Sequence, residues 1–218
     1  MAVNFKILIL EGGYNEEHEV SLNSSLEVQK VLKYLKIKFK TLMVKPQSFE
    51  KKISKYKDYL VFNALHGTFG EDGQVQKILK KNNIRFTHSS FLSSKKCFNK
   101  IIAKNIVKKN NILTPKFTIL KKEDINIENI LILKKKYKKI VIKPSSSGSS
   151  YGIKIIKNKK DFENLINKIK KFKNEFQFHD EILIEEFIEG KELTVSTIKF
   201  SGTVNALAVT EIKTKNKF

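Results

Sequence analysis

The sequence predicts an α/β protein whose N-terminal part contains a parallel sheet. Phe5–Leu10 is apolar except for Lys6, ends at Glu11 and a Gly-Gly turn, and is followed by a helical pattern. This is the order of the first half of a βαβ unit. Tyr59–Leu65 repeats that order, with a glycine-rich loop and a second helical pattern after the strand. Because ligands bind beyond the carboxyl ends of strands in such sheets, we expect the two turns to meet at one site.

The remaining elements follow from apolar spacing. A helix from Cys97 to Asn110 would carry Lys100 and Lys104 on one face and end just before Pro115. Ser89–Lys96 has a loop-like composition and is the first expected domain boundary, and residues 128–137 fit a helix or a strand. Further strands are expected at residues 36–44, 84–86, 117–120 and 206–212, and further helices through Leu26, Val31, Leu32 and Leu35, at 49–56, and at 161–172, where Phe162, Leu165, Ile166 and Ile169 share one side.

Length and composition restrict the class of protein. The 218 residues suffice for one large or two small domains. The longest apolar runs are too short to span a bilayer, and the first ten residues show no cleavage site of a signal peptide. A single cysteine, Cys97, fits a reducing cytoplasm. We therefore expect a cytoplasmic protein with no membrane partner.

The net charge of +21 suggests nucleic-acid binding at first sight. Of the 43 basic residues, however, only Arg85 is an arginine, although readers of bases and phosphates favour the planar guanidinium group. Lysine, asparagine, isoleucine and phenylalanine are abundant along the whole chain, which indicates AT-rich coding rather than a binding patch. We expect no nucleic-acid partner.

The segment Ile140–Ile156, IVIKPSSSGSSYGIKII, reads as strand, loop and strand. Its loop is too rich in serine and glycine to fill a core, whereas Gly148 and Gly152 permit positive φ and close approach of a ligand. Backbone N–H groups, serine hydroxyls and Lys143 could together surround a phosphate. The alternative is a flexible hairpin. The chain contains no Walker A motif.

Two clusters of polar residues follow the first and third strands. Glu16, Glu17 and Glu19 stand at a helix entrance, where carboxylates are favoured by the helix dipole; the alternative is that one of them holds a substrate ammonium. The second cluster surrounds three glycines that turn geometry alone explains poorly, although a lone histidine there is more often structural than catalytic. It consists of His66, Gly67, Gly70, Glu71, Asp72 and Gly73.

Four motifs, in order, resemble those of the D-alanine–D-alanine ligase family of ATP-grasp enzymes: GGYNEEHEVSL, ALHGTFGEDGQVQ, VIKPSSSGSSYGI and ILIEEFIEGKELTV. The resemblance implies a Rossmann-like substrate domain at residues 1–92 and an ATP-grasp domain made of a central subdomain, 93–180, and the start of a C-terminal subdomain, 181–218, which would be incomplete. It also implies that ATP phosphorylates the carboxylate of one D-alanine and that the amine of a second attacks the acyl phosphate. D-Alanyl-D-alanine for peptidoglycan synthesis would result.

The resemblance also assigns roles to single residues. Glu17 would receive the ammonium of the first D-alanine, with His66 near the same substrate. Lys100 and Lys143 would contact the phosphates of ATP, and Ser149 and Ser150, with adjoining glycines such as Gly152, would form a mobile loop over them. The hinge Glu185, Glu186, Phe187 and Ile188 would face adenine, and Glu192 would bind ribose.

The chain departs from the family at two places. Asn99 stands where the family usually has aspartate before Lys100. The family's ω-loop, its arginine and its Mg²⁺ ligands would lie beyond Phe218, so no residue here is expected to bind metal. We interpret the sequence as a fragment and expect little ligase activity from it alone.

Other interpretations stay open. The alternatives are another ATP-grasp carboxylate–amine ligase and a non-catalytic remnant that binds nucleotide or amino acid. Because the family is often dimeric, a homodimer is possible.

Overall fold

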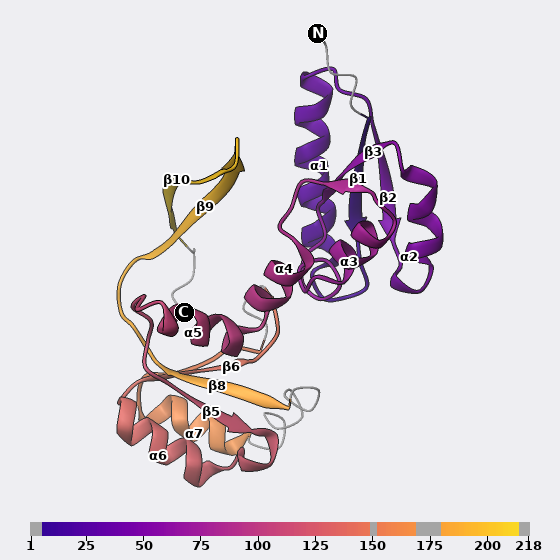
Figure 1. The fold of residues 1–218 in the computed structure, drawn as a ribbon. Helices are drawn as coiled ribbons and strands as arrows, with labels where there is room; N and C mark the ends of the chain where they lie inside the picture. Colours follow the sequence, from indigo (N-terminus) through magenta and orange to yellow (C-terminus); the bar gives the residue numbers. More distant parts are fainter. Residues whose placement is uncertain (1–5, 149–151, 169–179, 214–218) are drawn as a thin grey trace.

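The N-terminal lobe is built on a parallel sheet, as predicted. The computed structural model describes residues 6–148, 152–168 and 180–213 (Figure 1). Its first sheet has the strand order β2-β1-β3-β4, and every pairing in it is parallel. β1 is flanked on both sides and buries Leu8, Ile9 and Leu10 completely. The strands are β1 (Lys6–Gly12), β2 (Phe39–Val44), β3 (Tyr59–Asn63) and β4 (Arg85–Phe86).

Helices flank this sheet (Figure 1). They are α1 (His18–Tyr34), α2 (Pro46–Ile53), which continues into a 3-10 turn at Ser54–Tyr56, and α3 (Gln74–Lys81). α2 and α3 contribute to one core with the strands, in which the ring of Phe49 meets Phe69 edge-on at 5.6 Å. The buried members of this core are Leu8, Leu10, Val44, Phe49, Ile53, Val61, Leu65, Phe69, Val75, Leu79 and Ile84.

The first helix forms where it was predicted, but the apolar residues that indicated it are not the ones that it buries. Leu26, Val31 and Leu35 are more than half exposed, whereas Ser21 and Ser25 are fully buried. The Ser21 hydroxyl accepts from Gly12 N at 2.9 Å and donates to the Ala64 carbonyl at 2.8 Å. A buried hydroxyl with both partners carries no desolvation penalty, so this face of α1 binds strand ends rather than filling a core.

The prediction of a loop at Ser89–Lys96 is wrong, because most of that segment belongs to α4 (Phe91–Phe98). Ser90 caps this helix, because its hydroxyl accepts a hydrogen bond from Ser93 N. Serine is a preferred residue at this position. The next helix, α5 (Lys100–Lys109), begins three residues later than predicted. Asn99 separates the two helices and caps α5 by accepting from Ile102 N at 2.9 Å.

The second lobe contains an antiparallel sheet with the order β5-β8-β6-β7. The predicted hairpin at Ile140–Ile156 forms its β6 and β7. Its strands are β5 (Phe117–Lys121), β6 (Ile140–Pro144), β7 (Lys154–Ile156) and β8 (Glu181–Glu186). A core of isoleucines and leucines packs between this sheet and two helices, with Ile130, Ile140, Ile142, Ile182 and Ile184 fully buried.

Those two helices are α6 (Ile127–Tyr137) and α7 (Lys159–Asn167), with a 3-10 turn at Lys122–Asp124 before α6. The ambiguous residues 128–137 are therefore helical, and Asn126 caps them. Asn158 and Asp161 form a reciprocal capping box that starts α7 two residues earlier than predicted. Ile169 and Phe172 of the predicted helix lie outside the described residues.

The last described elements are β9 (Glu192–Phe200) and β10 (Thr203–Ile212), which pair antiparallel as a two-stranded ribbon whose side chains are exposed. Figure 1 shows this ribbon apart from both sheets. None of the described helices is long and apolar enough to cross a membrane.

Lys138 connects α6 to β6 in a strained turn. Its φ is 64° and its ψ is −60°, and Lys139 N donates to the Tyr137 carbonyl at 2.8 Å across it, which is a γ-turn with positive φ. Glycine adopts such a conformation without the Cβ penalty of about 1–2 kcal/mol.

We predict that Lys138→Gly is more stable than Lys138→Ala by about 1 kcal/mol, measured by urea unfolding. Lys135 is exposed and lies inside α6. There Lys135→Ala should be more stable than Lys135→Gly by about 1 kcal/mol, because glycine weakens a helix. The same order at both positions would contradict a strained turn at Lys138.

Candidate functional site

The serine-glycine loop is the segment 145–153 between β6 and β7. Its start is fixed to the N-terminus of α5. Lys100 N donates to the Ser145 carbonyl at 2.8 Å, and Asn99 and Ser146 form a β-bridge. The Lys100 ammonium donates to the Ser147 carbonyl at 2.7 Å and contacts its hydroxyl at 3.2 Å. The predicted phosphate loop and Lys100 are therefore brought together. Ser149 and Ser150 lie outside the described residues.

Gly148 and Gly152 serve this loop in different ways. Gly152 has a φ of +71°, and a Cβ there would approach Pro144 Cγ to 2.8 Å. Gly148 lacks the predicted positive φ, but a Cβ on it would overlap the Glu17 carboxylate. The loop thus needs glycine at 148 for close approach rather than for backbone freedom.

Three lysines gather around one buried carboxylate beside this loop. Glu185, at the end of β8, is 4% exposed and forms ion pairs with Lys104 of α5 and Lys143 of β6. Burial and the neighbouring charge of Lys143 lower the pKa of Lys100, while Glu185 and Glu17 act in the opposite direction. Concentrated positive charge of this kind suits an anionic ligand. Lys104 was placed on the correct helix face, but its pairing with Glu185 was not predicted.

Glu17 lies where the two lobes meet. It is 3% exposed and stands at the N-cap of α1, where its side chain makes no capping hydrogen bond to the helix, so the helix could favour it there only through the charge of its dipole. Cβ atoms on Gly67, from the N-terminal lobe, and on Gly148, from the serine-glycine loop, would both overlap its Oε2 atom. Two loops from different lobes therefore enclose this carboxylate.

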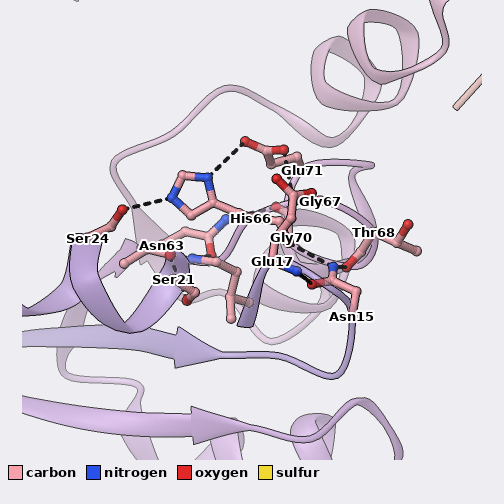
Figure 2. A network of polar contacts seen from close by, with 12 residues as sticks. Asn15, Glu17, Ser21, Ser24, Asn63, His66, Gly67, Thr68, Gly70 and Glu71 are labelled. Atoms are coloured by element: carbon pink, nitrogen blue, oxygen red, sulfur yellow. Dashed lines mark hydrogen bonds and ion pairs between the residues drawn. The ribbon is translucent and has the colours of Figure 1, made fainter. Parts of the chain in front are cut away.

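Figure 2 shows the polar network around Glu17 and His66. His66 Nε2 and the Ser24 hydroxyl are 2.9 Å apart, and Glu71 Oε1 lies 3.9 Å from His66 Nδ1. The other oxygen of Glu71 accepts from Gly67 N at 2.9 Å. Ser24, from α1, and Glu71, from the loop after β3, thus orient the imidazole of His66. Glu17, which was predicted to bind the same substrate, belongs to the same network (Figure 2).

Asn15 joins the two predicted turns and was missed by the sequence reasoning. Its Nδ2 atom donates to the carbonyls of His66 at 2.9 Å and Thr68 at 3.1 Å (Figure 2). Its Oδ1 atom accepts from Glu17 N at 3.0 Å, which is an Asx turn. The available signal was an asparagine shortly after a Gly-Gly turn, and its long-range role could not be read from that.

Most of the glycine-rich loop after β3 has a structural role. Gly67 and Gly73 have positive φ, and Gly70 packs tightly on Leu65. The Asp72 carboxylate accepts from Phe69 N and Gln74 N, both at 3.0 Å. Turn geometry thus explains more of this motif than was predicted.

The hinge after β8 is held by backbone hydrogen bonds. Glu186 N donates to the Lys116 carbonyl and Phe187 N to the Lys139 carbonyl, both at 2.9 Å, so the N–H of Phe187 is already used. The ammonium of Lys157 lies 4.4 Å from the centroid of the Phe187 ring.

The predicted hinge continues into exposed residues. Ile188 is 60% exposed, and Glu192 opens β9 with an exposed side chain. The Glu189 carboxylate is bound by Lys139, and the hydrogen bond and charge of that lysine lower the pKa of Glu189. The hinge is therefore fixed at its start and open to solvent at its end.

A cavity of about 580 Å³ adjoins His66. It lies between the end of β3, the Ser24 side of α1 and the Ser93 side of α4, and offers room for a small molecule. Within the described ranges, no three His, Cys, Asp or Glu side chains gather as a metal would require.

The family model described as the D-ala D-ala ligase C-terminus matches residues 106–218, which is more than half of the 218 residues. The chain belongs to the D-alanine–D-alanine ligase family. The resemblance read from the four motifs is thereby confirmed, and so is the mixed α/β fold class.

Named members of the family match almost the whole chain. The D-alanine–D-alanine ligase of Pelagibacter ubique is 38% identical over 98% of this chain, and that of Wolbachia pipientis wMel is 35% identical over 97%. The chain spans only 66% and 62% of the length of these relatives. The Bacillus anthracis ligase complexed with ATP is 30% identical, with a TM-score of 0.76 over 98% of this chain and 68% of its own. A Vibrio cholerae D-alanyl-alanine synthetase, 22% identical with a TM-score of 0.80, shows the same fold.

We predict that the cost of a side chain at position 148 depends on Glu17. Gly148→Ala should destabilise the chain by about 1–3 kcal/mol, because an added methyl group overpacks a filled site. In a Glu17→Ala background the same change should cost much less, and urea unfolding of the four proteins measures the coupling. Strictly additive effects would contradict close packing of the two residues.

Proposed function

We propose that this chain supplies the D-alanine-binding and ATP-binding parts of an ATP-dependent D-alanine–D-alanine ligase. The observation that carries the proposal is the approach of Gly148, in the serine-glycine loop, to the buried Glu17 carboxylate. An amino acid whose ammonium rests on Glu17 would place its own carboxylate near the phosphates held by Lys100 and Lys143. Phosphorylation of a carboxylate requires this proximity.

The proposed reaction has two steps. The carboxylate oxygen of the first D-alanine attacks the γ-phosphorus of ATP, ADP leaves, and an acyl phosphate forms. The amine of the second D-alanine then attacks the acyl carbon, phosphate leaves, and a proton is lost as the peptide bond forms. Lys100 and Lys143 neutralise phosphate charge, and the loop with Ser149, Ser150 and Gly152 excludes water from the acyl phosphate.

The remaining predicted residues take supporting roles in this proposal. His66, oriented by Ser24 and Glu71, lies beside the first D-alanine. Since the N–H groups of Glu186 and Phe187 are already bound, adenine would be read partly through other backbone groups of the hinge Glu185–Ile188, with Glu192 on the ribose. No step is assigned to Mg²⁺, because no group of three His, Cys, Asp or Glu side chains gathers in the part of the chain that the structure describes.

We also infer the setting of this activity. Use of ATP supports a cytoplasmic setting, and the division into residues 1–92, 93–180 and 181–218 stays part of the proposal, with its first boundary inside α4. A homodimer is part of the proposal, and analytical ultracentrifugation would test it by giving a dimer or a monomer mass.

We predict that Lys143→Met weakens ADP binding about tenfold, because a charge-assisted contact with phosphate is lost. Isothermal titration calorimetry of the purified chain measures this. Lys135→Met removes the same charge from an exposed position of α6 and should leave the affinity unchanged. Equal effects of the two variants would contradict a phosphate role for Lys143.

The ligase reaction itself is tested in a polypeptide of the relatives' full length. We predict D-alanine-dependent phosphate release with D-alanyl-D-alanine detected by mass spectrometry, and a KM for D-alanine raised at least about tenfold by Glu17→Gln, because a charged partner of the substrate ammonium is lost. Turnover of D-serine in place of the second D-alanine would support another carboxylate–amine ligase instead.

A further inference from the structure

Lys104 is a buried cation that the proposed reaction does not use. It lies one helical turn after Lys100 in α5 and is 7% exposed. Its ammonium donates to Glu185 Oε1 and lies 4.9 Å from the centroid of the Phe117 ring. Phe117 is the β5 partner of Glu185 in the sheet. A lysine ammonium enclosed by a carboxylate and an aromatic face has little freedom to turn toward a ligand.

Lys143 binds the same carboxylate from a more open position. It pairs with Glu185 Oε2, and its side chain is 28% exposed, whereas those of Lys104 and Glu185 are 9% and 5% exposed. Glu185 therefore has one enclosed cation and one cation at the rim of the phosphate loop. Only the rim cation can leave toward a ligand while the carboxylate stays paired.

This asymmetry determines what happens when a phosphate arrives. If Lys143 turns toward the phosphate, Glu185 keeps Lys104 as its counter-ion. Without Lys104, the same movement would leave a buried carboxylate unpaired, which is strongly unfavourable. Lys143 would then remain bound to Glu185 and the phosphate would lose a partner.

We propose that Lys104 is a positioning residue, the permanent counter-ion of Glu185 that frees Lys143 to bind nucleotide phosphate. The inference rests on the proposed function, because it assumes that Lys143 contacts the phosphates. It assigns to Lys104 no contact with the nucleotide. The opposing view is that Lys104 only stabilises the fold.

The first experiment separates phosphate binding from adenosine binding. Isothermal titration calorimetry compares ADP with adenosine in the wild-type chain, in Lys104→Met and in Lys104→Gln, which keeps a hydrogen-bond donor but removes the charge. Both variants should bind ADP about tenfold more weakly and adenosine with nearly unchanged affinity. Lys108→Met, at an exposed position of the same helix, should match the wild type for both ligands.

The outcomes are distinct. Equal weakening for ADP and adenosine, or unchanged ADP binding in both Lys104 variants, overturns the role of Lys104 and leaves the proposed function intact. Failure of the wild-type chain to bind ADP overturns the proposed function, and with it the part of the inference that concerns phosphate.

The second experiment needs no nucleotide. Acetic anhydride labelling followed by peptide mass spectrometry measures the reactivity of Lys143 in the folded chain. Among the described residues, Lys143 becomes the only ion-pair partner of Glu185 when Lys104 is replaced, so its labelling rate should fall severalfold in Lys104→Gln and Lys104→Met and stay constant in Lys108→Met. Unchanged labelling of Lys143 overturns the inference, and an increase, which unfolding would cause, overturns it as well.

Discussion

The approach of Gly148 to the Glu17 carboxylate is the contact on which the arrangement of the site depends. Glu17 belongs to the parallel-sheet lobe and Gly148 to the hairpin of the other lobe, and a Cβ on Gly148 would not fit. Gly67 imposes the same restriction from the first lobe. A buried carboxylate is unfavourable unless cations or donors surround it. The site therefore brings together, at one acidic side chain, a glycine of the loop after β3 and a glycine of the serine-glycine loop in the second lobe.

The second constraint is electrostatic and acts on the phosphate side of that contact. Lys100, Lys104 and Lys143 lie close together, and Glu185 is the acidic residue that two of them share. Repulsion by Lys143 and burial both lower the pKa of Lys100. Such a cluster is under-neutralised before any ligand is present, so an anion that enters it relieves repulsion as well as gaining contacts. The excess of lysine on the chain as a whole is a separate matter, because most of it lies outside this cluster.

The sequence predicted the parts of the fold that depend on local pattern. The strand predicted at Phe5–Leu10 and the two strands of the hairpin at 140–156 are mostly apolar runs beside glycine or serine, and such runs have few alternatives. α4 was missed because its N-cap and first turn are serine-rich, and serine favours caps and loops alike. The ion pair of Lys104 with Glu185 joins residues 81 apart in the chain, and no local spacing can indicate such a contact. Asn15 was missed for the same reason, since its partners His66 and Thr68 are 51 and 53 residues away.

Asn99 illustrates how a single departure from the family can leave the fold intact and still change the site. Its side-chain oxygen caps α5, a task that aspartate and asparagine perform about equally well. Aspartate would also place a negative charge next to Lys100, whereas asparagine does not. The charges that raise the pKa of Lys100, against burial and Lys143, are those of Glu185 and Glu17. The substitution thus preserves the helix start on which the serine loop docks, and it leaves the lysine cluster more positive toward an incoming phosphate.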